Sequence, residues 1–345
     1  VFWDRDVFAQ RSGSQVPSTV GARATDENYG KVNIYGGELS INWRDKIGKD
    51  FKYSIGVNTD YQDNKVLKMH WPDMIEIDGL HPGGRKDTGT WGLEAMGMFR
   101  SYQDIEEYFD RYNITNYLGL SKSQVYPGML IYKDVRGKQN PDGSWNAPDG
   151  VVDLKDDKVK ISNRSNPYGL AVNLKAEYKA LSFSAQISAN WGGYGFVPTY
   201  ARSAGHSRTS GVSARDALSF INMPSFWAND MFVYEEVRDE NGNVLVEQNL
   251  NAQYPNLSYD INKHASTFWK VSSARVALRN LTIAYALPKQ LINKVGIESC
   301  RLNFTGQNLL SFYNPYPDNF MDPMSGEYGS YPTLRRFTLG LNVSF

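Results

Sequence analysis

The sequence is poor in cysteine, in net charge and in long apolar runs. Its 345 residues include one cysteine, Cys300, which excludes an intrachain disulfide framework. Lysine and arginine total 37, equal to aspartate and glutamate, so the basic excess of a nucleic-acid-binding protein is missing. The mean hydropathy is −0.50, and no run approaches the ~18 apolar residues of a membrane helix. These values are typical of a soluble protein, but membrane β-strands that alternate apolar and polar residues also average to a polar score.

A targeting segment and catalytic motifs are also missing. The chain starts VFWD, without methionine, a basic region or an apolar core, and we interpret it as a mature product, a fragment or a chain whose start is missing. The four histidines (His70, His81, His206 and His264) are far apart, and no metal-ligand, nucleophile or phosphate-binding motif accompanies them. We therefore expect no enzyme.

The dominant pattern in the sequence has a period of two. Residues 181–191 alternate strictly, with Leu, Phe, Ala, Ile, Ala and Trp on one face and Ser or amide side chains on the other. Residues 170–178 and 338–345 repeat this pattern. The 11 residues of 181–191 are long enough to cross a bilayer as a tilted strand, which needs ~9–11.

Further segments complete a set of about nine or ten strands. The clearer ones are 31–43, 51–59, 276–287 and 300–311, and weaker ones are 65–69, 94–99 and 126–135. Short turns follow some strands, at 46–50 and 178–181, while long irregular stretches at 70–93, 192–268 and 313–333 follow others. Capping-box-like starts at Ser101 and Ser213 predict two short loop helices. Short turns at one end and long loops at the other are typical of an antiparallel outer-membrane β-barrel.

A water-soluble β-sandwich is the alternative interpretation, because its strands alternate too. Sandwich strands average ~5–6 residues, shorter than the longest runs here. The 46 aromatic residues, 13% of the chain, include several at strand ends, as in the aromatic girdles of membrane barrels. The pattern favours the membrane barrel over the sandwich.

An acidic segment at 133–157 is the best candidate for metal chemistry. Its aspartates include Asp134, Asp149 and Asp153, and Gly150 supplies a turn between them. Hard cations such as Ca²⁺ prefer closely spaced carboxylates at a sharp turn. The DxDxDG spacing is missing and Lys133, Arg136 and Lys138 dilute the charge, so a plain turn is the alternative.

Large aromatic residues in the predicted loops are candidates for ligand contact. Trp71, Trp91, Trp145, Phe226 and Trp227 lie in segments where an apolar ring needs a partner. They could contact a sugar, a peptide or a partner protein, or they could stack on one another and stiffen the loops.

Three C-terminal blocks carry a specific resemblance. Residues 277–288 (ALRNLTIAYALP), 299–312 (SCRLNFTGQNLLSF) and 335–345 (RRFTLGLNVSF) resemble the last strands of SusC/RagA-type TonB-dependent outer-membrane transporters. Upstream, residues 28–66, 96–105 and 126–134 resemble further blocks of the same family in the same order. Two features depart from the family: a longer insertion replaces its compact Asp/Asn/Gly loop after Asp134, and nothing resembles its plug domain or TonB box.

The resemblance implies the fold and the partners. It implies that residues 1–345 are the C-terminal portion of a 22-stranded barrel, with the plug domain and N-terminal strands outside this chain. It implies energised import of oligosaccharides or peptides across the outer membrane of a Bacteroidota-type bacterium, with a SusD-like surface lipoprotein as lid and TonB acting through the plug. Loops 192–268 and 313–333, the latter with Tyr316, would contact the lid or substrate, and Phe345 would be the signal for barrel assembly. A secreted β-rich carbohydrate-binding module, a glycoside-active enzyme and a passive porin are the alternatives.

Overall fold

The computed structural model describes residues 1–11, 26–69, 76–81, 83–163, 165–202, 229–324 and 331–345. None of the helices in these ranges is long and apolar enough to span a membrane. The predicted helix at Ser213 lies outside the described residues.

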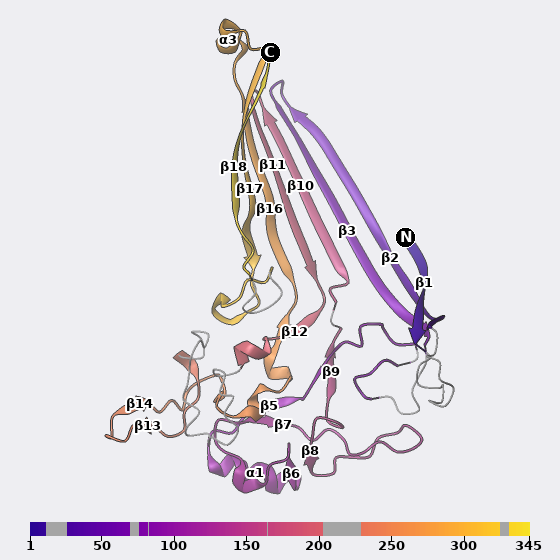
Figure 1. Cartoon of the computed structure of the whole chain (residues 1–345), viewed down its shortest axis with the longest axis vertical. Coiled ribbons are helices and arrows are strands. Elements are labelled where there is room, and N and C mark those ends of the chain that lie inside the picture. Colours follow the sequence, from indigo (N-terminus) through magenta and orange to yellow (C-terminus); the bar gives the residue numbers. More distant parts are fainter. Residues whose placement is uncertain (12–25, 70–75, 82, 164, 203–228, 325–330) are drawn as a thin grey trace, which may run out of the picture.

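One long antiparallel sheet dominates the molecule (Figure 1). Its strands follow in the spatial order β1, β2, β3, β10, β11, β16, β17 and β18, so each strand pairs with the preceding and following sheet strands in the chain. The bounds are β1 Phe2–Arg11, β2 Asp26–Ile47, β3 Phe51–Lys68, β10 Tyr168–Tyr178, β11 Leu181–Trp191, β16 Arg275–Ala286, β17 Ser299–Tyr313 and β18 Arg336–Ser344. Within the described residues, β1 and β18 each pair on one side only, so the sheet is open.

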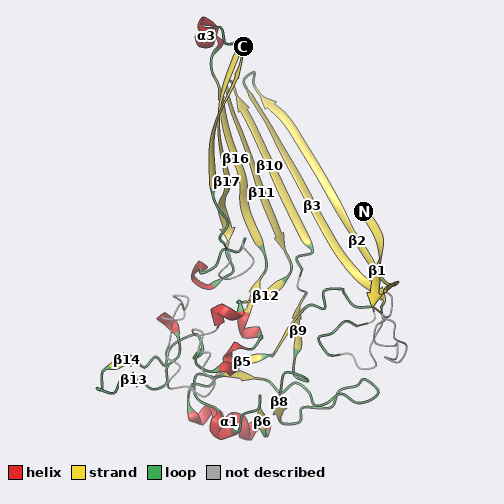
Figure 2. Cartoon of the chain, viewed as in Figure 1, coloured by secondary structure: helices red, strands yellow, loops and turns green. Residues whose placement is uncertain are grey.

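The two ends of the sheet differ (Figure 2). At one end, the turn end, tight turns join β2 to β3 and β10 to β11, and Gly48 and Lys179 take left-handed backbone angles there. The short helices α3 (Lys289–Ile292) and η6 (Asn293–Val295) join β16 to β17 at this end. At the other end, the loop end, long connections follow β3, β11 and β17. The predicted layout of short turns and long loops is confirmed.

The clearly alternating segments form strands of the main sheet, whereas only one of the three weaker segments does. Residues 181–191 form β11 with the predicted bounds, and 65–69 belongs to the end of β3. The predictions at 94–99 and 126–135 as further wall strands are wrong. They hold β5 (Ala95–Met98) and β7 (Leu130–Tyr132), which form a separate two-stranded ladder in a long connection. The sheet gains β1, a charged strand that the alternation did not reveal.

The connections after β3 and β11 fold together into what we call the loop domain. The first contributes β4 (Thr90–Gly92), β5, helix α1 (Tyr102–Tyr112), β6 (Asn116–Tyr117), η2 (Lys122–Gln124), β7, β8 (Val151–Val152) and β9 (Val159–Ser162). The second contributes β12 (Tyr194–Phe196), η3 (Thr199–Arg202), β13 (Val237–Arg238), β14 (Val244–Val246), η4 (Asp260–Lys263), η5 (Thr267–Trp269) and β15 (Lys270–Ser272). The capping box predicted at Ser101 is present, because the Ser101 side chain accepts a hydrogen bond from Asp104 N and Asp104 accepts one from Ser101 N.

The buried apolar core of the molecule lies in the loop domain rather than on the sheet. Its fully buried members include Phe99, Tyr117, Leu130, Leu257 and Trp269, drawn from both connections. The close approach of the two connections requires Gly92, since a Cβ there would lie 2.5 Å from Ala265 O.

One buried amide joins the two connections. Asn262 is fully buried; its Nδ2 donates to Gly128 O and Asn256 O, and its Oδ1 accepts from Leu130 N at 2.7 Å. Gly128 O and Asn256 O also accept from the backbone N–H groups of Asn256 and Tyr259, so Leu130 N is the group that would lose its side-chain partner without Asn262. A loop region with its own core and internal hydrogen bonds is a folded domain, unlike a set of flexible connections.

Candidate functional site

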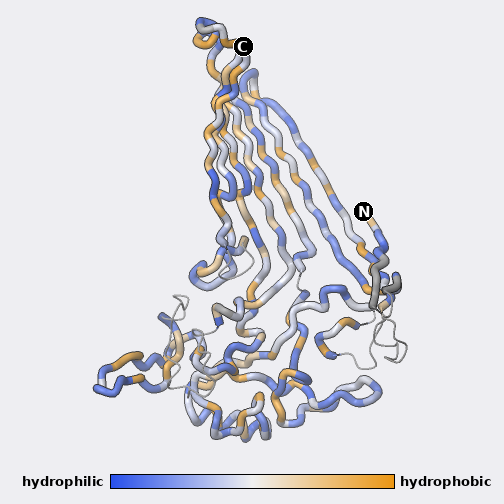
Figure 3. Tube along the Cα trace, viewed as in Figure 1, coloured by the Kyte–Doolittle hydropathy of each residue, from blue (hydrophilic) through white to orange (hydrophobic). Residues whose placement is uncertain are grey.

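The main sheet has one apolar and one polar face, and the strand register extends each face across neighbouring strands. Trp43 of β2 pairs with Ile55 of β3, which pairs with Leu174 of β10. The same row continues through Ala185 and Leu281. In the colouring of Figure 3, apolar and polar residues alternate along these strands. We call the side with this row the apolar face.

Within the residues that the structure describes, the apolar face is not covered. Its exposed side chains include Trp43 at 60% exposure, Phe337 at 64% and Leu339 at 77%. An aqueous protein rarely leaves a contiguous apolar surface of this extent open, so such a surface marks contact with a membrane or a partner. The β-sandwich interpretation is wrong for the same reason, because a sandwich covers its inner face with a second sheet.

The polar face carries hydroxyl, amide and charged side chains that bond to one another across strands. Asn280 Nδ2 donates to Gln186 Oε1 at 2.8 Å, and Arg279 Nε donates to Ser188 Oγ at 3.0 Å. Thr282 and Thr305 share a hydroxyl hydrogen bond at 3.1 Å. These residues give the sheet a surface suited to water and polar solutes.

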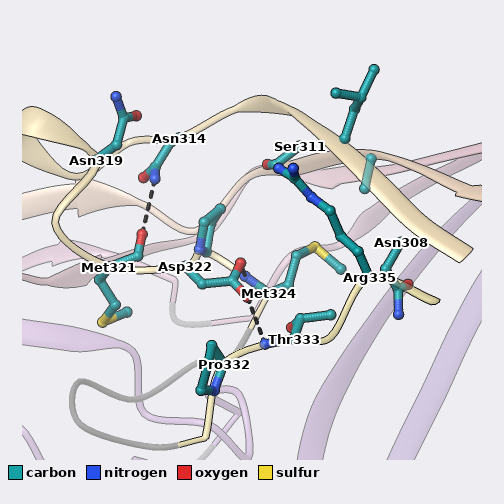
Figure 4. A pocket seen from close by; sticks show the side chains of 13 residues that line it. Asn308, Ser311, Asn314, Asn319, Met321, Asp322, Met324, Pro332, Thr333 and Arg335 are labelled. Atoms are coloured by element: carbon teal, nitrogen blue, oxygen red, sulfur yellow. Dashed lines mark hydrogen bonds between the residues drawn. The ribbon is translucent and has the colours of Figure 1, made fainter. Parts of the chain in front are cut away.

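A pocket of about 320 Å³ lies at the loop end, under the connection from β17 to β18 (Figure 4). Its described lining includes Ser311 and Asn314 near the end of β17, and Asp322, Thr333 and Arg335 in the connection. The Arg335 side chain extends over the pocket towards Ser311 (Figure 4). An arginine, a carboxylate and several hydroxyl or amide groups suit a polar ligand.

Backbone hydrogen bonds hold Asp322 in this pocket. Its Oδ1 accepts from Met324 N at 2.8 Å and its Oδ2 from Thr333 N at 3.0 Å. Partial burial opposes ionisation of this carboxyl, but the hydrogen bonds and the nearby charge of Arg275 outweigh burial and hold its pKa below the ordinary value. Asp322 is therefore an anion that shapes the connection.

The two predicted aromatic contact residues that the structure describes, Trp91 and Tyr316, lie in different connections. Trp91 is half-buried in β4 and its Nε1 donates to Thr88 O at 2.7 Å, so its polar group is satisfied within the chain. Tyr316 lies in the β17–β18 connection, half-buried, with its ring 5.4 Å from that of Phe320. Trp71, Phe226 and Trp227 lie outside the described residues. The roles of these residues in ligand or lid contact stay predictions.

The predicted cation ligands, Asp134, Asp149 and Asp153, lie together in the loop domain and bond to its backbone. Asp134 Oδ2 accepts from Gly150 N, Asp149 Oδ1 from Val151 N, and Asp153 Oδ1 from Asp156 N. In the described part of the chain, no group of three or more histidine, cysteine, aspartate or glutamate side chains has a metal-binding arrangement. The carboxylates therefore organise the turn, and Ca²⁺ binding stays a prediction.

Uncompensated negative charge remains around this turn. Asp134 Oδ1 is buried without a hydrogen-bond partner among the residues described. Burial raises the pKa of Asp134 despite the hydrogen bond from Gly150, and neighbouring Asp149 and Asp153 add to the rise. Burial likewise raises the pKa of Asp157, a fully buried carboxylate that accepts from Val135 N and Arg136 N.

Phe345 directly follows β18 and is 88% exposed. The alternation along β18 places it on the same side as Leu339 and Leu341, which is the apolar face. The residue is thus accessible. Its role in barrel assembly stays a prediction.

Sequence reasoning missed Asn262, Arg275, Asp322 and Arg335. They lie in or beside irregular connections, where no periodicity indicates which residues meet. Residues 256–266 (NLSYDINKHAS) are mostly polar, so nothing in the sequence distinguishes Asn262 from its neighbours.

Comparisons with known proteins identify the relatives of this chain. No family model matches it. TonB-dependent receptor P3 of Formosa agariphila is 25% identical over 348 residues, covering 96% of this chain and 30% of the relative. TonB-dependent receptor P39 of the same bacterium is 24% identical over 362 residues, with 96% and 32% covered.

The chain is a homologue of TonB-dependent receptors. Solved structures of the RagAB peptide transporter and of the RagAB peptide importer in the closed-closed state share its fold, with TM-scores of 0.61 and 0.65. Their sequence identities are 18% and 17%; 96% and 99% of this chain are covered, but only 31% and 33% of theirs. The chain thus spans about a third of the length of its relatives. The SusC/RagA resemblance and the partial antiparallel outer-membrane barrel predicted from the sequence are confirmed.

Proposed function

We propose that this chain forms part of the barrel wall and the extracellular loops of a TonB-dependent outer-membrane transporter that imports oligosaccharides or peptides. The observation that carries the proposal is the uncovered apolar face, continuous across the strands of the sheet and opposite a polar face. The apolar face would contact lipid and the polar face would line the lumen. In this role the chain has no catalytic step of its own.

The remaining wall is part of the same proposal. An open sheet leaves unpaired backbone groups on β1 and β18, which a bilayer does not tolerate. We infer that the chain is the C-terminal portion of a longer polypeptide whose other strands close the barrel and whose plug contacts TonB. The relatives support this inference, because they are about three times longer than the region matched.

The loop domain suits a role at the cell surface. A folded domain at one end of a membrane wall can present a fixed surface to a lid, and we propose a SusD-like lipoprotein as that partner. The names of the structural neighbours describe a peptide transporter and a peptide importer, which supports an import function by analogy. The pocket at Asp322 and Arg335 would be one polar contact for the substrate.

Two measurements test the proposal. The full-length protein should fractionate with the outer membrane, need detergent for extraction and migrate faster on gels before heating than after, as intact barrels do. Deleting its gene, or the gene for TonB, should abolish growth on one class of oligosaccharide or peptide. Extraction without detergent would refute the barrel, and uptake that persists without TonB would favour the passive porin.

A further inference from the structure

The connection from β16 to β17 differs from the other connections at the turn end. It takes residues 287–298, whereas the turns after β2 and β10 take only residues 48–50 and 179–180. We call residues 287–298 the α3 connection, after the first of its two short helices. It extends beyond the ends of β17 and β18 (Figure 1). A two-residue turn is enough to reverse an antiparallel chain, so the extra length needs another explanation.

The α3 connection has a defined shape. Leu287 N donates to Cys300 O at 2.9 Å at its start, and Ile297 N donates to Ile292 O at 3.2 Å near its end. Between them, Gly296 takes a left-handed backbone angle (φ 73°) and ends η6. These contacts fix the backbone, so the side chains of the connection have set positions relative to the sheet.

The α3 connection lies at the edge of the apolar face. Cys300, at the start of β17, has the strand parity of Leu302 and Phe304, yet it is buried, whereas they are exposed. Strand neighbours on both sides do not bury Leu302 or Phe304, so a further element covers Cys300. The helix α3 lies against β17, and its Ile292 is buried. The connection therefore covers the start of β17 from the apolar side.

Aromatic residues mark the level of the apolar face that borders the α3 connection. Tyr178 of β10, Leu181 of β11 and Tyr285 of β16 lie opposite one another in one row, and all three are exposed. Phe51 of β3 continues this row. Tyrosine rings prefer the headgroup level of a bilayer. Since the α3 connection starts directly beyond the row, it lies at the headgroup level or just outside it.

The side chains that the α3 connection exposes suit that level. Leu291 is 62% exposed. Lys289 and Lys294 are exposed on either side of it, and neither forms an ion pair with another described residue, whereas Lys179 of a neighbouring turn does. Glu298 is the one carboxylate of the connection. An apolar side chain flanked by cations is typical of segments that lie in a lipid interface.

We propose that the α3 connection binds phospholipid headgroups of the inner leaflet of the outer membrane, with Lys289 and Lys294 on the phosphates and Leu291 at the acyl-chain boundary. This inference rests on the proposed function, because it needs the apolar face to contact lipid and the turn end to face the periplasm. Phosphates complement the two lysines in charge, and long lysine side chains reach the headgroup level readily. The contact fixes the depth of this part of the wall in the membrane.

A lipid surface fits the α3 connection better than a periplasmic protein. Stable protein interfaces bury about 800 Å² on each partner and have an apolar centre. The connection offers one strongly exposed apolar side chain, Leu291, which is a small area by comparison. Shallow insertion into lipid needs no larger area, because the apolar face beside the connection continues the same contact.

Quenching by brominated lipids tests the inference on the full-length protein in vesicles of phosphatidylglycerol and phosphatidylcholine. Leu291→Cys, in a Cys300→Ala background, carries a fluorophore, and bromines near the headgroup or near the end of the acyl chain report its depth. We expect the shallow bromines to quench the label at position 291 strongly and the deep bromines to quench it weakly. Lys155→Cys, at an exposed position of the loop domain, is the control that neither set should quench.

Charge variants provide a second readout. Lys289→Glu with Lys294→Glu should move the label at position 291 away from the bilayer, so that the shallow bromines quench it less. Lys289→Arg with Lys294→Arg should keep the quenching, because arginine also pairs with phosphate. Quenching that no change of charge affects would show a label that partitions into lipid by itself, and would overturn binding through the two lysines.

A label on β11 separates this inference from the proposed function. Phe183→Cys, on the apolar face, should be quenched by the deep bromines. If it is and the label at position 291 is not quenched at all, the wall lies in lipid and the inference alone fails. Shielding of position 291 from a water-soluble quencher in the native outer membrane, without quenching in vesicles, would indicate a protein partner and would also overturn it. No quenching at position 183 would refute both.

Discussion

The loop domain buries its apolar side chains in a core, whereas the sheet exposes many of its apolar side chains on one face. In the loop domain, apolar side chains from two distant connections meet in a closed core around Tyr117 and Trp269. On the sheet, side chains of the same types, such as Trp43 and Leu339, stay exposed on one face. The loop domain is therefore built for water, whereas the sheet needs an apolar environment on one side. A single hydropathy average conceals this division.

Truncating one tryptophan in each region should give the largest difference in stability between the two regions. Trp269→Ala should destabilise the loop domain by about 3–5 kcal/mol, because it leaves a cavity in a closed core. Trp43→Ala removes a side chain that is 60% exposed and should leave the loop domain unchanged. Hydrogen exchange of loop-domain amides in detergent-solubilised full-length protein measures both effects. Equal exchange in the two variants would show that the loop domain has no core of its own.

Charge placement on adjacent residues of β11 tests the two faces of the sheet. Phe183→Lys puts an ammonium on the apolar face and should cost about 2–4 kcal/mol if the site lies near the bilayer midplane. Ser184→Lys puts the same group on the polar face, where water solvates it. It lies opposite Lys175 of β10, and this like-charge pair should cost less than about 1 kcal/mol. Denaturant titration in lipid vesicles measures both variants. A larger cost for Ser184→Lys would reverse the assignment of the faces.

The dependence of stability on pH should be the smallest of these effects, and we expect it in the loop domain. Burial raises the pKa values of Asp134, Asp156 and Asp157, so the folded state favours their protonated forms. Their contribution to stability is thus full below the ordinary value near 3.8 and is lost as the pH rises through the raised values. Asp156→Asn should remove part of this dependence, as measured by proteolysis rates of the loop domain while the pH is raised from about 4 to about 7.

Added calcium tests the predicted cation site at the same acidic turn. If Ca²⁺ binds at the turn, it should slow proteolysis of the loop domain at neutral pH, and Asp134→Asn should abolish the effect. Asp142→Asn, in the same segment but outside the predicted ligand set, is the matched control. Proteolysis that does not respond to calcium would refute the predicted site.

The two regions also differ in how far the sequence predicts them. Strands such as β11 follow from local alternation, because neighbouring residues face opposite sides and the register carries the pattern across the sheet. The loop domain depends on contacts between distant segments, such as Leu130 N with Asn262 Oδ1, which no local period encodes. For the same reason β5 and β7 resembled wall strands in the sequence, and the pocket residues Asp322 and Arg335 were not predicted.

The most direct test is an accessibility scan along β11. Single cysteines at residues 183–188, in a Cys300→Ala background, are spin-labelled in the full-length protein in lipid vesicles. Two quantities are measured at each label: its accessibility to oxygen, which concentrates in lipid, and its accessibility to a water-soluble nickel complex. We predict that both alternate along the strand with a period of two. Phe183, Ala185 and Ile187 should favour oxygen, while Ser184, Gln186 and Ser188 should favour nickel. Equal exposure of both series to the nickel complex would contradict a membrane wall.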